Sequence, residues 1–304
     1  TPSSVSAQSD SVVFDTGSPQ QLYSHEEALY FLDEFDVNEA LKFNVGLRYS
    51  MYQQVGPFTR YIKGGIGSQD TAINYAPGSL IKNYQGFEPR LSFRWMLPDK
   101  SSIKAGYAYN YQYVHLTSLS AVSLPTDIWF PSTDKAKPQT GWQGSVGYFK
   151  NFDDDKWETS VEIYYKGMNN LIEYKEGALP GDNINDNTDN LLVYGKGWAY
   201  GIEFFVKRTV GKFTGWIGYT WSKTERKFPD LNEGNIFPAK YDRRHDLSIV
   251  GTYTLNDRWT FSSAFIYATG NTLTLPTSWY VQEQNLLFNY GQTLGCLLIE
   301  YYKC

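Results

Sequence analysis

Three histidines are the side chains of this sequence best suited to acid–base or metal chemistry. His25, His115 and His245 lie far apart, on different predicted strands or loops. A catalytic or metal site needs such groups to converge, and no pattern in the sequence brings these three together. The sequence also contains no Ser-His-Asp, Walker or dinucleotide-binding signature. We therefore predict no enzyme activity, no metal site and no cofactor.

Two charged segments carry residue types that bind ions. GDNINDNTDN, residues 181–190, has the carboxylates and amides of a calcium loop but lacks its central glycine. If Asp186 is position one, Gly197 stands where the bidentate glutamate is needed. We interpret this segment as a solvated loop, and weak calcium binding stays open. YDRRHD, residues 241–246, lies where a long loop enters a predicted strand, which favours a salt-bridge network at a rim over an active site.

The elements that position these residues are strands in which apolar and polar residues alternate. In IKAGYAYNYQY, residues 103–113, one set carries Ile103 and four tyrosines, and the interleaved set carries Lys104, Asn110 and Gln112. A period of two predicts a β-strand with two unlike faces. The same pattern recurs at residues 41–51, 88–97, 140–149, 157–166, 200–207, 213–222, 246–255 and 259–268. Residues 27–34 form a tenth predicted strand whose faces are less distinct.

Charge falls on only one face of the nine clear strands. The other face is rich in Tyr, Trp and Phe, as if it met lipid, where a charge costs about 2–4 kcal/mol at mid-bilayer. Strands of about ten residues, tilted by about 45°, span on the order of 25 Å of hydrocarbon. Aromatic residues near the strand ends, where a girdle meets the headgroups, are Trp95, Tyr113, Trp157, Trp221 and Trp259. We therefore expect the aromatic face to contact a bilayer rather than a protein core.

The connections between the strands alternate in length. Short joins at 35–40, 98–102, 151–156, 209–212 and 256–258 alternate with long ones at 52–85, 114–139, 169–190 and 224–244. Outer-membrane barrels have short periplasmic turns and long extracellular loops. The predicted fold is all-β: an antiparallel meander of about ten strands from a transmembrane outer-membrane β-barrel, here an open or partial barrel.

Composition excludes several other classes of protein. The 304 residues are 17% aromatic, and no apolar run approaches the roughly 18 residues that a spanning helix needs. The net charge of -5 is too mild to indicate a nucleic-acid partner. Cys296 and Cys304, the two cysteines, both lie near the end of the sequence, so no disulfide framework shapes the main body.

Several segments resemble the barrel of TonB-dependent outer-membrane receptors, especially those of Bacteroidota. They include LKFNVGLRYSMY, FEPRLSFRWMLPDKSSIKAGYAYNYQYVHL, GKGWAYGIEFFVKRTVGKFTGWIGYTWSKTERKF and FPAKYDRRHDLSIVGTYTL, and the resemblance covers roughly residues 20–290. It implies a barrel of about 22 strands around an N-terminal plug. It also implies import of a scarce nutrient (an iron chelate, cobalamin, a peptide or an oligosaccharide) into the periplasm, energised by an inner-membrane complex through a TonB box. The implied partners are outer-membrane lipid, the TonB complex, the receptor's own plug domain and a small nutrient ligand.

The resemblance also suggests how the chain is organised. We expect an internal piece of a longer receptor, without plug domain or TonB box. Residues 1–24 would end a preceding extracellular loop, and residues 25–292 would form the partial barrel. Residues 293–304 are atypical, because alternation stops in GQTLGCLLIEYYKC, and we hypothesise a frameshifted tail. Recognisable barrel strands in the next reading frame of the coding DNA are the expected result.

Two sets of residues are candidates for contact with a ligand or with the plug. Aromatic side chains in predicted extracellular loops can stack on sugars or siderophore rings, although loop packing or a girdle role would explain them equally; they are Tyr75, Trp129, Phe130, Trp279 and Tyr280. Polar side chains expected to face the lumen, where they contact the plug or keep the interior polar, are Arg48, Arg90, Arg94 and Glu203. The alternative function is a non-transporting surface β-protein, such as an adhesin or a carbohydrate-binding module.

Overall fold

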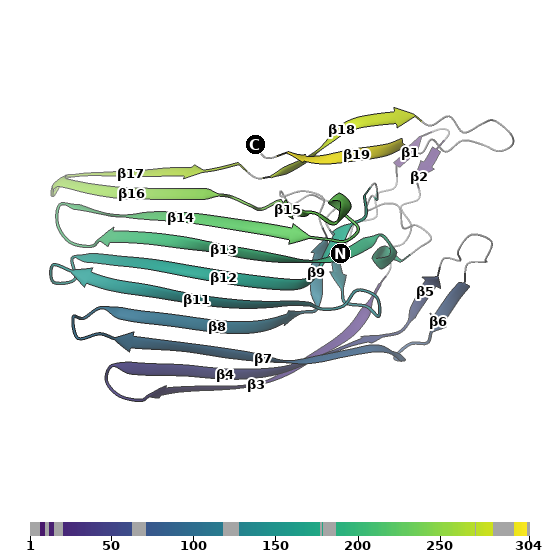
Figure 1. Cartoon of the computed structure of the whole chain (residues 1–304), viewed down its shortest axis with the longest axis horizontal. Coiled ribbons are helices and arrows are strands. Elements are labelled where there is room, and N and C mark those ends of the chain that lie inside the picture. The colour runs from purple at the N-terminus through teal and green to yellow at the C-terminus, as the bar shows by residue number, and fades with distance from the viewer. Residues whose placement is uncertain are drawn as a thin grey trace.

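One large antiparallel sheet dominates the computed structural model, which describes residues 7–9, 12–14, 21–62, 71–117, 128–176, 178, 187–270, 272–281 and 295–302. Its strands follow one another in space in the order of the chain (Figure 1). They are β3 (Tyr23–Asp36), β4 (Leu41–Val55), β7 (Leu80–Met96), β8 (Ser102–Gln112), β11 (Gln139–Phe152), β12 (Trp157–Tyr174), β13 (Leu192–Arg208), β14 (Phe213–Lys227), β16 (His245–Asn256) and β17 (Trp259–Ala268). The predicted meander of ten strands is confirmed, and β3 and β17 form the two edges of an open sheet.

The smaller elements lie mostly within the long connections. They are the hairpins β5 (Phe58–Ile62) with β6 (Thr71–Tyr75) and β9 (Val114–Thr117) with β10 (Ile128–Pro131), the 3-10 turns η1 (Thr188–Asn190) and η2 (Asn232–Gly234), and β15 (Ile236–Pro238), which pairs with β14. Two further pairs are separate from the large sheet: β1 (Ala7–Ser9) with β2 (Val12–Phe14), and β18 (Leu273–Val281) with β19 (Gly295–Tyr302). The expected tail at 293–304 overlaps β19, and its frameshifted origin stays a prediction.

The predicted alternation of short and long connections is confirmed. The short turns lie together at one end of the sheet and the long connections at the other (Figure 1). At the turn between β11 and β12, Asp153, Asp154 and Asp155 have φ values of 53°, 51° and 63°. Aspartate tolerates this left-handed region because its short polar side chain bonds locally; here Asp153 Oδ2 accepts from Lys156 Nζ at 3.1 Å.

The two faces of the sheet differ as the alternation predicts. One face, called the apolar face below, carries Leu91, Tyr107 and Ile217, which are 45%, 42% and 48% exposed. No second layer covers these side chains in the described part of the chain, so the sheet is not half of a sandwich. The other face, called the charged face below, carries Arg48 and Arg90. Arg48 is paired with Glu88 in the β4–β7 ladder, and Ser50 Oγ donates to Glu88 Oε1 at 2.6 Å on the same face.

The strands are longer than the expected ten residues or so. β12 has 18 residues and β13 has 17, because the two strands go on pairing up to Tyr174↔Leu192, beyond the length that crosses hydrocarbon. Their ladder shifts register between Asn169 and Leu171, and Asn170, with φ of 55°, is the extra residue. Such a bulge bends a strand. Asn170 Nδ2 donates to the Pro138 carbonyl at 2.9 Å, which fastens the bend to the neighbouring connection.

Aromatic rings form a continuous row on the apolar face. Ring centroids lie 5.3 to 6.5 Å apart along Tyr107, Trp142, Tyr165, Tyr200 and Trp221, which come from five neighbouring strands. The spacing is that of stacked and edge-on aromatic pairs. Trp221 is the one member of this row among the five aromatic residues predicted near strand ends, and the girdle itself stays a prediction.

Tyr113 was predicted to belong to the girdle, and the structure contradicts this prediction. It is 3% exposed, and its ring stacks on Tyr52 of the charged face at 5.1 Å. Its hydroxyl lies 2.8 Å from Ser50 Oγ. The alternation fails here because β8 ends at Gln112, so that Tyr113 no longer follows the faces of the strand.

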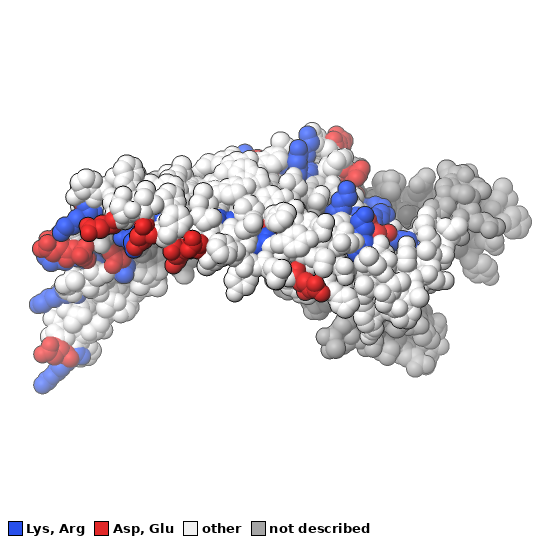
Figure 2. Space-filling model, turned by 90° about the horizontal axis from the view of Figure 1, so that it is seen from below, with Lys and Arg blue, Asp and Glu red and all other residues white. Residues whose placement is uncertain are grey.

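On the side of the molecule seen in Figure 2, charged residues lie mainly toward the two ends. Figure 2 shows Lys, Arg, Asp and Glu gathered at the end with the short turns, on the left, and again toward the loop end, with a largely uncharged stretch between them. That distribution suits a wall whose middle crosses hydrocarbon. Among the described residues no helix is long and apolar enough to span a membrane.

Candidate functional site

The long connections pack together at one end of the sheet around two apolar clusters. Both clusters involve the tips of β12 and β13. One contains Phe130, Ala136, Ile172, Tyr174 and Leu192. The other contains Leu171, Val193, Phe228, Leu231 and Phe237. The hairpin tip is therefore held between the β8–β11 connection and the β14–β16 connection.

Arg60, on β5, is the centre of an ion-pair network that joins three of the connections. Its Nη1 donates to Asp189 Oδ1 at 2.6 Å and Oδ2 at 2.8 Å, and its Nη2 pairs with Asp134. Arg60 is 6% exposed and Asp189 is 1% exposed. Thr133 Oγ1 also donates to Asp189 Oδ2 at 2.6 Å. Buried charges need this degree of pairing and hydrogen bonding, so we call Arg60, Asp134 and Asp189 the loop node.

The charged face of the wall anchors the same connections. The hydroxyls of Tyr52 and Tyr84 donate to the carbonyls of Ser132 and Thr133, each at 2.8 Å. Gln54 Oε1 accepts from the backbone N–H of Asp134 at 2.9 Å. The loops are thus tied to β4 and β7 on the side that carries the charges. They cover this end of the charged face, which we call the mouth.

The histidines do not form a site. His115 is fully buried beside Ser132, with Nε2 3.0 Å from Ser132 Oγ, and burial lowers its pKa to about 4. His245 Nδ1 lies 2.8 Å from Tyr219 Oη, and His25 lies opposite Gln53 on the edge strand. The described residues include no group of three or more His, Cys, Asp or Glu that could hold a metal ion.

The three predicted ligand-binding aromatics whose side chains the structure describes, Tyr75, Trp129 and Phe130, differ in their surroundings. Tyr75 stacks on Phe58 at 6.5 Å and borders a hollow of about 640 Å³, and Trp129 is 66% exposed on β10. Phe130 is 4% exposed and belongs to the first apolar cluster, so its side chain packs within the loops, which is one of the alternatives to ligand contact. Trp279 and Tyr280 lie on β18, where the side chains are outside the described part of the structure. Their role in binding stays a prediction.

The four predicted lumen residues all project from the charged face. Arg48 lies 3.7 Å from Glu26 and 4.0 Å from the buried carboxylate of Glu88. Arg90 Nη2 donates to Asn110 Oδ1 at 3.0 Å. Arg94 Nη2 lies 2.9 Å from Met96 Sδ. Glu203 stands directly opposite Glu162 in the β12–β13 ladder. Contact of these side chains with a plug stays a prediction.

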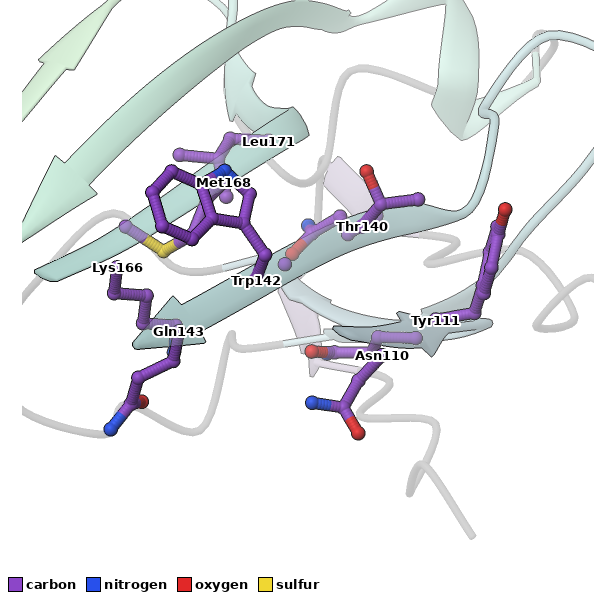
Figure 3. Close-up of a pocket in the computed structure, with 11 residues that line it drawn as sticks. Asn110, Tyr111, Thr140, Trp142, Gln143, Lys166, Met168 and Leu171 are labelled. Carbon is purple, nitrogen blue, oxygen red and sulfur yellow. The ribbon is translucent and has the colours of Figure 1, made fainter. Parts of the chain in front are cut away.

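A small hollow of about 160 Å³ lies below the loops, between β8, β11 and β12. Asn110 and Gln143 point to one side of the strands in Figure 3, and Trp142 and Leu171 lie on the other. The amides of Gln112 and Gln139 and the ammonium of Lys166 also line it. Side-chain amides both donate and accept, so this part of the wall can bind neutral polar groups such as hydroxyls and carbonyls.

Some of this arrangement could be read from the sequence and some could not. The YDRRHD segment forms the expected rim contacts: Asp242 accepts from the Thr224 N–H at 2.7 Å and from Arg244 Nη2 at 2.9 Å. The loop node was not predicted. Arg60 and Asp189 are 129 positions apart in irregular segments, where periodicity gives no signal. The buried Glu88 looked like an ordinary member of a polar face, and the buried Gln54 fell within the predicted long connection 52–85.

Comparison with known proteins places these features in a family. The family described as TonB dependent receptor-like, beta-barrel matches residues 2–293. Among solved structures, the pyoverdine outer membrane receptor FpvA from Pseudomonas aeruginosa PAO1 has a TM-score of 0.56 and 16% identity over 86% of this chain and 34% of its own. The FrpB iron transporter from Neisseria meningitidis (F3-3 variant) has a TM-score of 0.55 and 11% identity, over 84% of this chain and 35% of its own. The copper transporter OprC has a TM-score of 0.55 and 13% identity, over 80% of this chain and 35% of its own.

The chain spans about a third of the length of these receptors, and no curated protein matches it. The expected bacterial group stays a prediction, because the family match does not depend on it. The two unlike faces, the alternating connections and the family match agree. The chain therefore belongs to the TonB-dependent receptors, a family of non-enzymatic outer-membrane proteins of Gram-negative bacteria, and forms part of their β-barrel.

Proposed function

We propose that this chain forms part of the wall of a receptor that imports a scarce nutrient across the outer membrane. The observation that carries the proposal is the two-faced wall: a bare apolar face for lipid, and a charged face whose mouth is covered by loops joined through the loop node. A water-filled or plugged passage needs polar groups on the inside and none on the lipid side.

The candidate nutrients remain an iron chelate, cobalamin, a peptide or an oligosaccharide. The similar solved structures are described as receptors or transporters of pyoverdine, iron and copper, which makes a metal chelate the first to test. The amide-lined hollow suits carbonyl and hydroxyl groups, which chelates and sugars both carry.

A plug inside the barrel is the partner that the charged face supports best. Glu162 and Glu203 stand directly opposite each other on neighbouring strands, and like charges in that position destabilise a sheet unless a cation lies between them. We infer that a basic side chain of a plug domain fills this position, with the TonB complex acting on that plug from the periplasm. The double substitution Glu162→Gln with Glu203→Gln should weaken retention of the plug, measured as faster proteolysis of the plug in intact outer membranes.

Uptake by cells tests the function directly. Cells that produce the receptor should accumulate a labelled nutrient from a panel that starts with ferric siderophores, and an uncoupler of the inner-membrane proton gradient should abolish the uptake. The alternative, a non-transporting adhesin or carbohydrate-binding protein, requires sugar binding without energised uptake. Binding of a panel member that is unaffected by the uncoupler, with no accumulation in the periplasm, would favour that alternative.

A further inference from the structure

The wall divides between two of its strands on the side of the long connections. From the short turns, β7 and β8 pair only as far as Arg90↔Ala108, although β7 extends to Leu80 and β8 to Gln112. Figure 1 shows β7 running on toward β5 and β6 while β8 ends. In the described part of the large sheet, every other neighbouring pair stays in register to within a residue of where one strand ends. We call this division the fork.

Pro89 explains where the fork begins. It is the first residue of β7 beyond the last rung with β8, and it still lies opposite Leu47 of β4. Proline has no N–H to donate to a ladder, so within sheets it occurs mainly at edges and bulges. From Pro89 toward the loops, β7 is therefore an edge strand that faces the fork.

Aromatic side chains fill the fork in place of backbone pairing. The Tyr111 ring lies so close to Gly86 of β7 that a Cβ at this glycine would be 2.3 Å from it. The next ring, that of Tyr113, stacks on Tyr52 of β4 at 5.1 Å. Apolar contacts of this kind are not directional, so they can separate while each strand keeps the hydrogen bonds of its own ladder.

The two sides of the fork, which we call leaves, are joined only through side chains. The first leaf consists of β5, β6 and the loop-side ends of β3, β4 and β7; the second consists of the loop-side end of β8 and the connections that follow it. No backbone–backbone hydrogen bond joins the described residues of one leaf to those of the other. The contacts are the loop node, the hydroxyls of Tyr52 and Tyr84, and Asn187, whose Nδ2 donates to the Thr59 carbonyl at 2.9 Å.

Buried polar atoms without partners lie along the contact between the leaves. Gln54 Nε2, Arg60 Nε and His115 Nδ1 have no hydrogen-bond partner among the described residues. Gln54 and Arg60 reach across to the second leaf, and His115 lies beside Ser132, to which Tyr52 donates. A buried polar atom without a partner costs free energy that contact with water removes. Separation of the leaves would hydrate these atoms, which offsets part of the cost of breaking the contacts.

A hollow of about 640 Å³ bridges the two leaves. Tyr61 and Ile73 line it from the first leaf, and Lys175 and Leu191 line it from the second. Because its walls belong to both leaves, the hollow widens when the leaves separate. The fork thus lies where a movement of the wall changes the width of the mouth.

We propose that the fork is a hinge that opens the mouth. The first leaf swings away from the second about the rung Arg90↔Ala108, while the wall between this rung and the short turns stays paired. The loop node and the ring contacts hold the closed state, and the ladders keep each leaf intact in the open state. The proposal goes beyond the proposed function, because it concerns how the wall moves whatever nutrient is taken up.

Distances between spin labels on the full-length receptor in outer membranes test the hinge by double electron–electron resonance. One pair of labels, at Asn83→Cys and Val206→Cys, joins the exposed side of the first leaf to β13. The matched pair, at Leu91→Cys and Val206→Cys, starts from β7 on the other side of the hinge rung. In a receptor without other cysteines, Arg60→Met should broaden the Asn83–Val206 distance distribution about twofold or more and leave the Leu91–Val206 distribution unchanged.

The second pair of labels separates the hinge from other movements. If only the loops opened, Asn83 would keep its distance from Val206, so an unchanged Asn83–Val206 distribution in both Arg60→Met and Tyr84→Phe would overturn the proposal. Equal broadening of both pairs would overturn it too, because the whole wall would then have loosened. Lys212→Met, at a short turn, is the control and should change neither distribution. Heat-modifiable mobility reports whether each variant is folded, and no nutrient is needed, so this proposal and the proposed function can fail separately.

Discussion

Replacing Arg60 by methionine should free the loops from one another while leaving the sheet folded. Methionine keeps much of the side-chain volume but leaves Asp189, which is 1% exposed, without its bidentate partner. Removing one member of a buried pair costs about 3–5 kcal/mol, because the remaining charge stays desolvated. Thr133 still donates to Asp189, and Asp134 is 34% exposed and can hydrate, so the lower end of that range applies. A loss of about 3 kcal/mol is about two factors of ten in the opening equilibrium.

Hydrogen exchange at two loop amides measures this opening. The Tyr61 N–H donates to Asn187 Oδ1 at 2.7 Å, and the Asp134 N–H donates to Gln54 Oε1, so both are protected only while the loops are joined. In Arg60→Met both should exchange about a hundredfold faster, and the double substitution with Asp189→Asn should recover most of the protection. Arg90→Met, which removes a contact to Asn110 on the exposed wall, is the matched control. Exchange in Arg60→Met no faster than in Arg90→Met would refute the reasoning.

Three further predictions concern the wall and the loop core. Ile217→Arg should lower the free energy of unfolding of the barrel by about 2–4 kcal/mol in urea titrations in lipid. Thr220→Arg, on the charged face, should change this free energy little. Burial lowers the pKa of His115 from 6.5 to about 4, so the free energy of opening the loop core should fall by about 3 kcal/mol as pH falls from 7 to 4. Hydrogen-exchange protection that stays constant over this pH range would contradict this, and so would a loss of protection that persists in His115→Gln. A Cβ at Gly86 would lie 2.3 Å from the Tyr111 ring, so Gly86→Ala should cost about 1–3 kcal/mol, and Tyr111→Ala should make that cost disappear in a double-mutant cycle.

Periodicity was sufficient to predict the wall. A strand has only two faces, so a charge-free set such as Leu91 and Ile217 identifies its lipid side without any knowledge of its partners. The order of the strands followed as well, since short and long connections alternate along a meander. The same reasoning failed at Tyr113 and in the length of β12. Alternation in the sequence shows neither where a strand ends and its side chains change direction nor where a strand extends beyond the bilayer.

The sequence by itself determined that this chain is a two-faced antiparallel wall and that its face of Leu91 and Ile217 carries no charge, since each residue reports its own face. Only the tertiary structure decided how the mouth is built: that Arg60 meets Asp134 and Asp189, that Phe130 is buried, and that β7 and β8 separate beyond Arg90. The physical reason is range. Alternation is a local property of the backbone, whereas contacts between loops and the register of paired strands join residues far apart in the chain, and no local pattern encodes them.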